Sequence, residues 1–489
     1  MNSPVVRLYV LVLLLFGSLV YFTSKWTVFD AESLEDKPEN RRPLIAEQQI
    51  PRGTISTADG VLLAESLPEG GGNRPVFVRR YPTDDPATFG NPVGYSFVEV
   101  GRTGIELSEN ELLSGEQNEF ATLIDQLRDE PAEGADITLT LDAEAQRLAT
   151  QLLEQAQGVA GSNGAGSVVA IEPDTGAIKV AASIPGFNPN AIAGAEQVAD
   201  VPGLFYRATQ STVQPGSTMK VVTLAAALDS GEIEPDTVIN ADSPKQISGF
   251  PLENAGGESF GDISATEALT NSVNTYWAQV GERLGADTMV EYMERFGFYS
   301  DPELDFPNDQ MAPSGPYAAN GELVKEGFDV GRVAIGQGGE EGQLLATPIQ
   351  MAEVAATIAN EGALMQPQFL LEAKDPDGRT IEELDADVQE QVISEETAAQ
   401  VAEMMTNVVN EGTASGLSVS TGPGTLAGKT GTAEIDVATS LNRPWFIGFA
   451  PVDDPQIAVA AMIEECTGCF GGEVAGPIAT QVMDSLLEG

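Results

Sequence analysis

The chain has 489 residues, which at roughly 150 residues per domain corresponds to about three domains. It carries 74 Asp and Glu residues against 24 Lys and Arg, a net charge of -50, and this excludes a basic nucleic-acid-binding face. It contains 0 histidines, which excludes a Ser-His-Asp triad, a Cys-His dyad and a His-ligated zinc site, so acid–base chemistry near neutral pH requires a lysine, carboxylate or tyrosine with a shifted pKa.

An apolar run at the amino terminus is the first predicted element. Residues 8–22 contain no charged side chain, and Arg7 and Lys25 flank them. Because about 20 apolar residues span a bilayer, we predict that residues 1–28 form a cytoplasmic stub and a transmembrane anchor. A signal peptide is the alternative, but no small-x-small cleavage site lies in residues 22–30. We therefore expect a single-pass protein of the cell membrane whose remaining domains are extracytoplasmic.

Residues 29–157 are predicted to form a β-rich domain. It begins with a charged, proline-containing linker at 30–42. An Asp-Gly pair between two strand-like segments then indicates a hairpin. The expected strands are 53–56, 61–64 and 136–141, and the expected helices are 117–127 and 143–156.

Residues 158–489 are predicted to form one larger α+β domain, beginning in a Gly-, Ala- and Ser-rich stretch. Strands are expected at both ends of this segment with helices between them, which predicts a single antiparallel sheet covered by helices. The expected strands are 166–171, 177–182, 428–433, 444–450 and 456–464. The expected helices are 217–228, 264–284, 289–296, 347–360, 396–410 and 474–487.

Acidic residues occur along the whole chain, as in the pairs at 84–85, 340–341 and 453–454. This distribution predicts a solvated acidic surface, which is tolerable where ionic strength screens the self-repulsion. A saline habitat is the hypothesis that follows.

Ser217 and Lys220 are the first candidate catalytic pair. Ser217 is expected to open an apolar helix, which places its hydroxyl among free N–H groups at the positive end of the helix dipole. Lys220 lies one helical turn further on the same face. In a chain without histidine, a desolvated lysine is the natural base for a serine nucleophile. A capping serine beside a surface lysine is the alternative that this pair alone leaves open.

Two further motifs carry polar side chains suited to the same chemistry. Ser272 and Asn274 are two residues apart, so they point together only from a strand or a tight loop, where they could relay a proton and hold an amide. On the flank of a helix they would be ordinary polar residues. The run from Lys429 to Thr432 lies in strand-like sequence, and its glycines permit a close approach. Its lysine and two threonine hydroxyls suit a carboxylate ligand.

The two cysteines, Cys466 and Cys469, are three positions apart. A zinc ribbon would need a second pair, and a redox dithiol would normally lie in a thioredoxin-like βαβ pattern that is absent around them. In an extracytoplasmic domain we expect a short structural disulfide, with two free thiols as the alternative.

In this order, Ser-x-x-Lys, Ser-x-Asn and Lys-Thr-Gly resemble the signature set of penicillin-binding proteins and serine β-lactamases. The sequence is most similar to the class B penicillin-binding proteins, the monofunctional peptidoglycan transpeptidases, and within them to the actinobacterial division-associated branch. It departs from the family at 56–58, where an acidic–basic pair is common, and in the cysteine loop. Matching segments are 52–55 with 59–60 and 63–64, 101–106 with 113–115, 336–338 with 347–351, and 445–451.

The resemblance implies an acyl-enzyme mechanism. Ser217 would attack the penultimate D-alanine carbonyl of a stem peptide ending in D-Ala-D-Ala, with Lys220 as the base. Burial and the nearby Lys429 would keep Lys220 neutral. Ser272 would pass the proton to the leaving amine, and Asn274 would orient Lys220 and the donor amide.

The family also implies how substrate is held. Lys429, Thr430, Gly431 and Thr432 would form the strip that binds the terminal carboxylate. The backbone N–H groups of Ser217 and Thr432 would form the oxyanion hole. The resemblance further implies that residues 29–157 form an elongated pedestal domain of the dimerisation type. It also implies β-lactams as covalent inhibitors and a membrane glycosyltransferase of the wall-synthesis machinery as a partner. It implies neither a cofactor nor a metal.

Other activities on the same fold remain open at this point. A D,D-carboxypeptidase differs only in using water as the acceptor. A β-lactamase or β-lactam sensor shares the three motifs, but needs neither the anchor nor the segment between anchor and catalytic domain. A catalytically silent scaffold of a wall-synthesis complex is disfavoured because the motif side chains are all present. A bifunctional enzyme is disfavoured because no separate glycosyltransferase-sized domain fits before Gly166.

Overall fold

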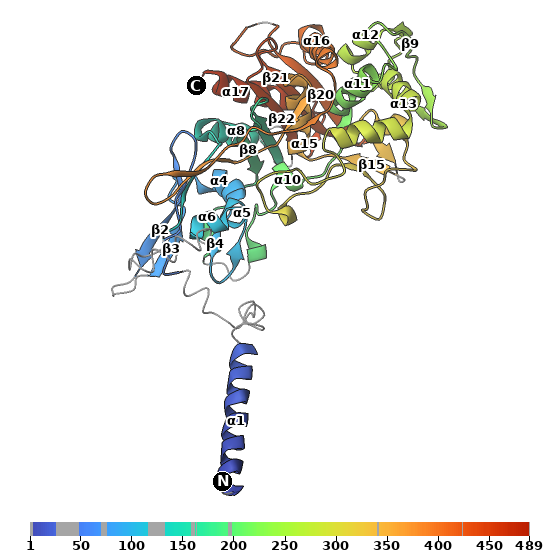
Figure 1. The fold of residues 1–489 in the computed structure, drawn as a ribbon. Helices are drawn as coiled ribbons and strands as arrows, with labels where there is room; N and C mark the ends of the chain where they lie inside the picture. The colour runs from blue at the N-terminus through green and yellow to red at the C-terminus, as the bar shows by residue number, and fades with distance from the viewer. Residues whose placement is uncertain are drawn as a thin grey trace.

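A computed structural model describes residues 3–25, 48–69, 76–115, 133–157, 162, 164–193, 198–339, 342–422 and 424–488. Figure 1 shows three parts in chain order: an isolated helix, a small β-rich part and a large α+β part. The predicted linker at 30–42 and the predicted helix at 117–127 lie outside the described residues.

Helix α1 (Ser3–Ser24) contains the apolar run predicted to be an anchor. Its segment Val5–Thr23 is long and apolar enough to cross a membrane, and it is not buried against any described part of the protein. Large apolar side chains left without a protein partner are normally covered by lipid or by another chain. The helix is therefore suited to anchoring.

The β-rich part is built on a six-stranded sheet in the order β18-β17-β6-β1-β2-β3. The Asp-Gly hairpin is present, because β1 and β2 pair in antiparallel register through Ile55 and Ala64. The two outer strands β17 and β18 come from late in the chain, inside the segment predicted to be the catalytic domain. The sheet thus joins both parts of the molecule, while the limits 29–157 and 158–489 remain a prediction. The strand bounds are β1 (Ile55–Ser56), β2 (Leu62–Glu69), β3 (Val76–Arg80), β6 (Asp136–Leu139), β17 (Leu370–Lys374) and β18 (Thr380–Glu383).

Short elements complete this part. They are α4 (Pro86–Val93), β4 (Ser96–Phe97), β5 (Gly101–Arg102), α5 (Ile105–Ser108) and α6 (Asn110–Ser114). Strands β4 and β5 form a separate two-stranded ladder.

The large part contains the predicted single antiparallel sheet covered by helices. Its order is β20-β21-β22-β7-β8, with the short β23 paired to β21. Strand β22 is buried along its whole length, because α17 and α15 pack on its two faces. Helix α8 lies beside α17, and α16 packs on β20. The strands are β7 (Gly166–Ile171), β8 (Ile178–Ile184), β20 (Ala427–Asp436), β21 (Leu441–Ala450), β22 (Ile457–Ile463) and β23 (Cys466–Thr467). The main helices are α8 (Ala143–Gln157), α11 (Lys220–Asp229), α12 (Ala265–Thr270), α13 (Asn274–Arg295), α15 (Pro348–Ala359), α16 (Glu395–Glu411) and α17 (Ala475–Glu488).

The prediction of a single helix at 264–284 is wrong. The segment forms two helices, α12 and α13, separated by a turn at 271–273. Ser272 has a φ of 56°, which a right-handed helix cannot accommodate. Helix α13 then continues through the gap predicted at 285–288, with a non-helical Gly285 inside it. The break at Ser272 is the feature that shapes the site.

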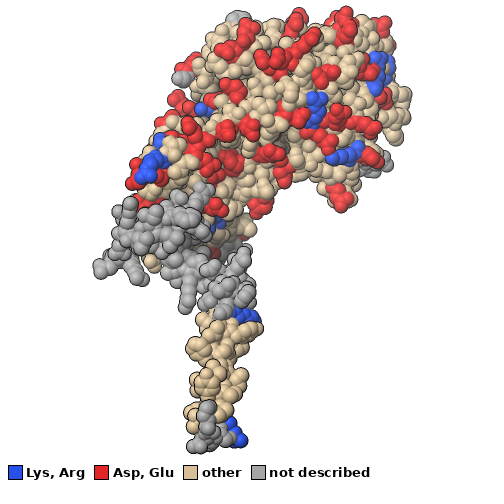
Figure 2. Space-filling view, viewed as in Figure 1, with Lys and Arg blue, Asp and Glu red and all other residues tan. Residues whose placement is uncertain are grey.

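Figure 2 shows acidic side chains across the visible face of both folded parts, with basic side chains in a few small groups. Such a surface repels itself at low ionic strength, as the composition predicts.

Candidate active site

Ser217 lies in a single 3-10 turn, η3 (Gly216–Met219), immediately before α11. Gly216 has a φ of 56°, and a Cβ placed on it would lie 3.0 Å from the backbone nitrogen of Ala433. The turn is therefore pressed against β20, close to Thr432. Ser217 is half-buried, and within the described part of the chain its hydroxyl forms no hydrogen bond. The hydroxyl is thus available to a substrate.

Lys220 is the first residue of α11 and is fully buried. Its Nζ donates to the Ser272 carbonyl oxygen at 2.7 Å and to Asn274 Oδ1 at 2.7 Å. Burial, and then the positive charge of Lys429, lower the pKa of Lys220 well below its usual range. A neutral amine has two N–H donors and one lone pair. In the neutral form, these two short hydrogen bonds use both donors and leave one lone pair that can accept a proton.

Ser272 links the two buried lysines. Its Oγ accepts a hydrogen bond from Lys429 Nζ at 2.9 Å and lies 3.3 Å from Lys220 Nζ. The left-handed turn at Ser272 makes this possible, because it ends α12 and lets Asn274 begin α13 beside it. The two polar side chains therefore point together from a tight loop.

Lys429 lies in β20, which crosses beneath the Ser217 turn. Its Nζ also donates to the Thr430 carbonyl oxygen at 2.9 Å, and burial lowers its pKa to about 7. A Cβ at Gly431 would lie 2.7 Å from the carbonyl oxygen of Pro215. Only glycine permits this close approach of the strand to the turn. Neither Lys220 nor Lys429 forms an ion pair with any described residue, so both remain available for chemistry or for an anion.

The two threonine hydroxyls of the strip have partners that the motif did not predict. Thr430 Oγ1 lies 2.6 Å from Thr413 Oγ1, and Thr432 Oγ1 accepts from the backbone nitrogen of Gly471 at 3.2 Å. Thr413 follows α16 and Gly471 follows the cysteine loop, far from the strip in sequence. No local pattern marks Thr413. The signal that could have found Gly471 is the Gly-Gly pair after a two-cysteine loop.

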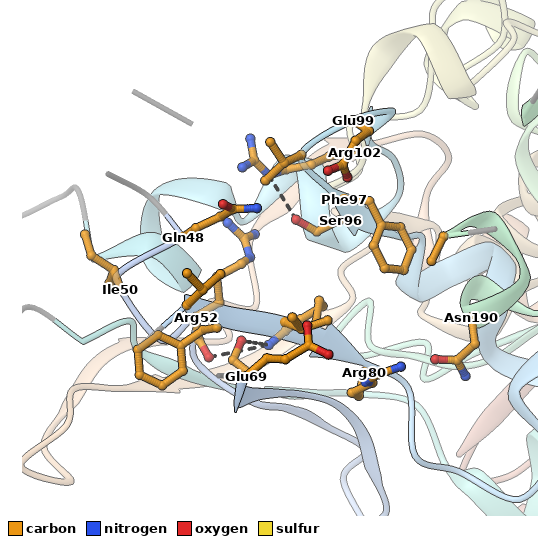
Figure 3. A pocket seen from close by; sticks show the side chains of 17 residues that line it. Gln48, Ile50, Arg52, Glu69, Arg80, Ser96, Phe97, Glu99, Arg102 and Asn190 are labelled. Carbon is orange, nitrogen blue, oxygen red and sulfur yellow. Dashed lines mark hydrogen bonds between the residues drawn. The ribbon is translucent and has the colours of Figure 1, made fainter. Parts of the chain in front are cut away.

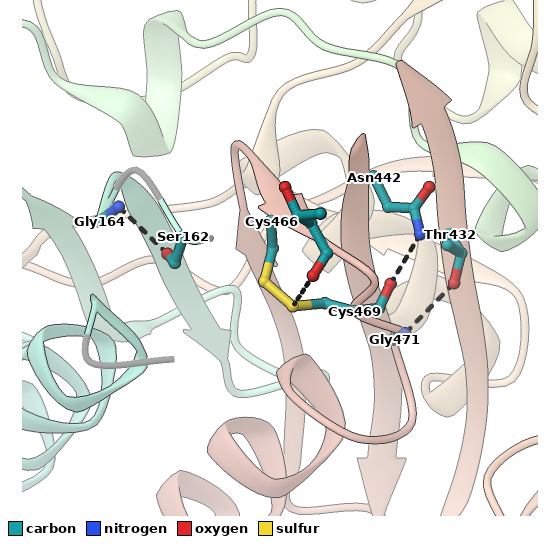
Figure 4. Close-up of a disulfide and its surroundings, with 8 residues drawn as sticks. Ser162, Gly164, Thr432, Asn442, Cys466, Cys469 and Gly471 are labelled. Carbon is teal, nitrogen blue, oxygen red and sulfur yellow. Dashed lines mark hydrogen bonds between the residues drawn. A yellow bond between two sulfur atoms is a disulfide. The ribbon is translucent and has the colours of Figure 1, made fainter. Parts of the chain in front are cut away.

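Cys466 and Cys469 are joined in a disulfide, and the loop they close lies against the strip (Figure 4). Strand β23 pairs with the start of β21, and Asn442 Nδ2 donates to the Cys469 carbonyl oxygen at 3.1 Å. The chain then turns so that the Gly471 N–H meets Thr432. The loop is thus part of the support of the candidate substrate strip.

The arrangement supplies a free hydroxyl, a buried amine with a spare lone pair, a bridging hydroxyl and a second buried amine. These are the parts needed for attack of a serine on a carbonyl beside a carboxylate. Among the described residues, no group of three or more Cys, Asp and Glu side chains is placed to hold a metal ion.

Comparison with known proteins places the chain in a family. The family model of the penicillin-binding protein transpeptidase domain matches residues 166–484, and that of the penicillin-binding protein A dimerisation domain matches residues 52–137. The chain therefore belongs to the penicillin-binding proteins, as a class B peptidoglycan D,D-transpeptidase. The resemblance inferred from the motifs is confirmed.

Particular relatives are similar over the full chain. The chain is 32% identical over 514 residues to the peptidoglycan D,D-transpeptidase PbpA of Mycobacterium tuberculosis, covering 100% of both proteins. It is 31% identical to PbpA of Mycolicibacterium smegmatis, covering 100% of the chain and 99% of the relative. The penicillin G acyl-enzyme complex of M. tuberculosis penicillin-binding protein A has a TM-score of 0.76 at 31% identity, covering 90% of this chain and 100% of that structure.

Proposed function

We propose that this protein is a membrane-anchored transpeptidase that cross-links peptidoglycan stem peptides through an acyl-enzyme on Ser217. The observation that carries the proposal is the fully buried Lys220 amine, which donates to Ser272 and Asn274 and whose pKa burial and Lys429 lower well below its usual range. A serine hydroxyl one turn away, with no histidine in the chain, needs such a base.

In the acylation step, the Ser217 O–H proton passes to the lone pair of Lys220 as Ser217 Oγ bonds to the penultimate D-alanine carbonyl carbon. The N–H groups of Ser217 and Thr432 stabilise the oxyanion, and each such donor contributes about 3–4 kcal/mol. The carbon–nitrogen bond then breaks. The proton moves from Lys220 through the Ser272 hydroxyl to the departing amine of the terminal D-alanine.

Residues of strand β20 bind the substrate carboxylate. Lys429 keeps a proton when an anion binds beside it, since a nearby negative charge raises the pKa of a lysine. Thr432 accepts from Gly471 N–H through one oxygen lone pair, which leaves its own O–H free to donate to the carboxylate. Thr430 occupies the same strip, with its hydroxyl held by Thr413.

The acyl-enzyme is resolved by an amine from a second stem peptide, which forms the cross-link. The names of the full-length relatives support a transpeptidase rather than a carboxypeptidase or a β-lactamase. The β-lactam acyl-enzyme of M. tuberculosis penicillin-binding protein A supports covalent inhibition of this chain at Ser217. We propose that α1 anchors the protein, that the folded parts are extracytoplasmic, and that a membrane glycosyltransferase is its partner.

Labelling of the full chain in membranes with a fluorescent penicillin tests the acyl-enzyme. The wild-type protein should be labelled, and Ser217→Ala and Lys220→Ala should not. Ser300→Ala is the matched control, because that exposed serine bonds only locally. Labelling retained in Ser217→Ala would refute the assignment. Rapid loss of label in the wild type would favour a β-lactamase, and release of D-alanine without amine incorporation would favour a carboxypeptidase.

A further inference from the structure

A cavity of about 320 Å³ lies beside α13 and α15, outside the candidate active site. It is lined by the end of α13, by the loop at 297–303, by the middle of α15, and by the paired strands β16 (Ala363–Met365) and β19 (Val388–Gln391). None of its lining residues takes part in the mechanism proposed above. Its volume is in the range of small-molecule sites.

One wall of the cavity carries a buried carboxyl group. All residues of α15 are buried, and Glu353 is the only charged residue in that helix. Glu353 is 5% exposed, and it lines the cavity. A carboxylate is rarely this buried unless a counter-charge or several hydrogen bonds compensate it.

The protein itself supplies little compensation for Glu353. Its Oε2 accepts one long hydrogen bond from Gln350 Nε2, at 3.4 Å, and the same nitrogen donates to the Phe296 carbonyl oxygen at 2.7 Å. Its Oε1 has no hydrogen-bond partner among the described residues, and this atom is accessible to solvent. Glu353 Oε1 is therefore open to a donor that enters the cavity.

The cavity drawn in Figure 3, in the β-rich part, provides a comparison. There Arg52 and Arg79 both pair with the fully buried Glu106. Burial raises the pKa of Glu106, but the two arginines outweigh burial and hold that pKa below its usual range. No described cation forms an ion pair with Glu353, and burial raises its pKa to about 8. A neighbouring cation would lower that pKa and favour the ionised carboxylate.

The mouth of the cavity is acidic as well. Asp301 and Glu303 line it, are exposed, and form no ion pair with a residue in the described ranges. Arg295, a basic residue of the lining, is held by other groups, because its Nη2 donates to the Gln391 carbonyl oxygen at 2.7 Å and its guanidinium lies over the Tyr292 ring. Two carboxylates at the mouth thus lack a counter-charge from the protein.

The other two carboxylates of the lining have basic partners. Glu294 forms an ion pair with Lys325, and Glu390 Oε1 lies 3.7 Å from Arg295 Nε. The uncompensated acidic groups are therefore one deep carboxyl group and two at the mouth.

These features define the chemistry of a ligand. Within the described part of the chain, no group of three or more Cys, Asp and Glu side chains is placed to hold a metal ion. An ammonium group has three N–H donors, and it forms a charge-assisted hydrogen bond with a single carboxylate. Pro302 and Leu364 add apolar surface that suits a hydrocarbon chain. A short aliphatic chain with an ammonium group at each end matches the deep carboxyl group, the apolar lining and the acidic mouth.

We propose that this cavity binds an aliphatic diamine, with one ammonium group at Glu353 and the other at Asp301 and Glu303. The bound diamine would join α15 to the 297–303 loop and stabilise the folded protein by mass action. The proposal does not depend on acylation at Ser217.

Calorimetric titration of the full chain in detergent micelles with 1,5-diaminopentane, at pH 6, 7 and 8, tests the proposal. Glu353→Gln is the variant, because glutamine has nearly the shape of the protonated carboxyl group and should preserve the fold. Glu403→Gln is the control, since it removes an exposed carboxylate of α16 outside the cavity. Pentane-1,5-diol is the uncharged ligand, and penicillin labelling of each protein checks that the catalytic domain is intact.

The diamine should bind the wild-type protein, and its affinity should rise about tenfold per pH unit below pH 8, because binding requires Glu353 to lose its proton. Glu353→Gln should weaken binding at pH 8 about tenfold or more and remove this pH dependence, while the control stays within about twofold. The diol should not bind.

Absence of diamine binding, or equal binding by Glu353→Gln, would overturn the site. Equal affinity for acetyl-lysine methylamide, which carries one ammonium group, would overturn the diamine and assign the cavity to a lysine side chain of a protein partner. Equal competition by Mg²⁺ would overturn the selectivity for an ammonium group. Failure of penicillin labelling with intact diamine binding would count against the proposed catalytic function only.

Discussion

The hydroxyl of Ser272 accepts a hydrogen bond from Lys429 Nζ at 2.9 Å. The same oxygen lies 3.3 Å from Lys220 Nζ, so one serine stands between two buried amines. Two positive charges this close together in a buried site would destabilise the folded protein. The pair is therefore most useful when Lys220 is neutral and Lys429 carries the proton. This division of roles leads to predictions on both lysines.

Replacement of Lys429 by methionine should stabilise the protein while abolishing penicillin labelling. The pKa of Lys429 is about 7 in the folded chain, against an ordinary value of 10.5, so burial of its charge opposes folding. The destabilisation is absent above pH 10.5, where the amine is neutral in both the folded and the unfolded chain. It grows as the pH falls and is complete below about 7. The gain in unfolding free energy for Lys429→Met should thus be largest below pH 7, about 3–5 kcal/mol, and shrink toward pH 10. Urea unfolding of both proteins at several pH values measures it, and a gain independent of pH would contradict the prediction.

Asn274→Asp should shift the pH dependence of acylation. A carboxylate would replace the amide oxygen that lies 2.7 Å from Lys220 Nζ. An adjacent negative charge favours the protonated amine, so the acidic limb of the acylation rate should move up by about 1–3 pH units. The rate of penicillin acylation measured from pH 5 to 9 checks this. Asn320→Asp, on an exposed turn, is the control, and an unmoved acidic limb in Asn274→Asp would show that Lys220 is not the base.

The disulfide loop should act on acylation through Thr432. Cys466→Ala/Cys469→Ala frees the loop whose Gly471 N–H orients the Thr432 hydroxyl, and we expect acylation to slow about three- to tenfold. Thr432→Val should slow it about tenfold or more, because a charge-assisted bond to the carboxylate is lost. Combining the two changes should cost no more than Thr432→Val alone. Additive losses in this double-mutant cycle would mean that the loop acts elsewhere.

Gly431→Ala should abolish acylation with little loss of secondary structure. The added Cβ would lie 2.7 Å from the Pro215 carbonyl oxygen and 3.0 Å from Thr218 Cγ2, so β20 and the Ser217 turn must separate. A displacement of about 1 Å at a catalytic group can cost about 100-fold in rate. Gly339→Ala is the matched control, since its added Cβ would meet no atom within 4 Å. Normal acylation in Gly431→Ala would contradict the close contact.

Salt should stabilise the protein. Its net charge of -50 is spread over the surface, and ions screen repulsion beyond a Debye length of about 10 Å at 0.1 M salt. The urea midpoint should therefore rise steadily from low to high NaCl. An equal osmolality of sucrose serves as the control for solvent exclusion. A midpoint that is flat in NaCl would reject both the surface-repulsion argument and the saline hypothesis.

Local sequence patterns were sufficient to predict many of the helices and strands. Apolar runs marked the buried strands β7 and β22, and Ser217 and Lys220 could be paired because residues three apart share a helical face. The run Thr347-Pro348-Ile349-Gln350 has the capping pattern of a helix start, and the Thr347 side chain does accept from Gln350 N–H. Such features depend on residues only a few positions apart, so they can be predicted from the sequence.

The break at Ser272 was not predictable in this way. Ser264 and Glu267 form a capping box that starts a helix, and nothing nearby signals its end six residues later. Helix α13 packs against α11, which lies about 50 residues earlier in the chain, so the turn is part of a contact between distant segments.

By itself, the order of residues determined the family, the three motifs and the absence of histidine chemistry. Only the tertiary structure decided that Lys429 reaches Ser272 across 157 positions, that Thr413 and Gly471 hold the threonine hydroxyls, and that β17 and β18 complete the N-terminal sheet. The physical reason is that local periodicity comes from backbone geometry, whereas contacts between distant segments exist only after their apolar faces have packed together.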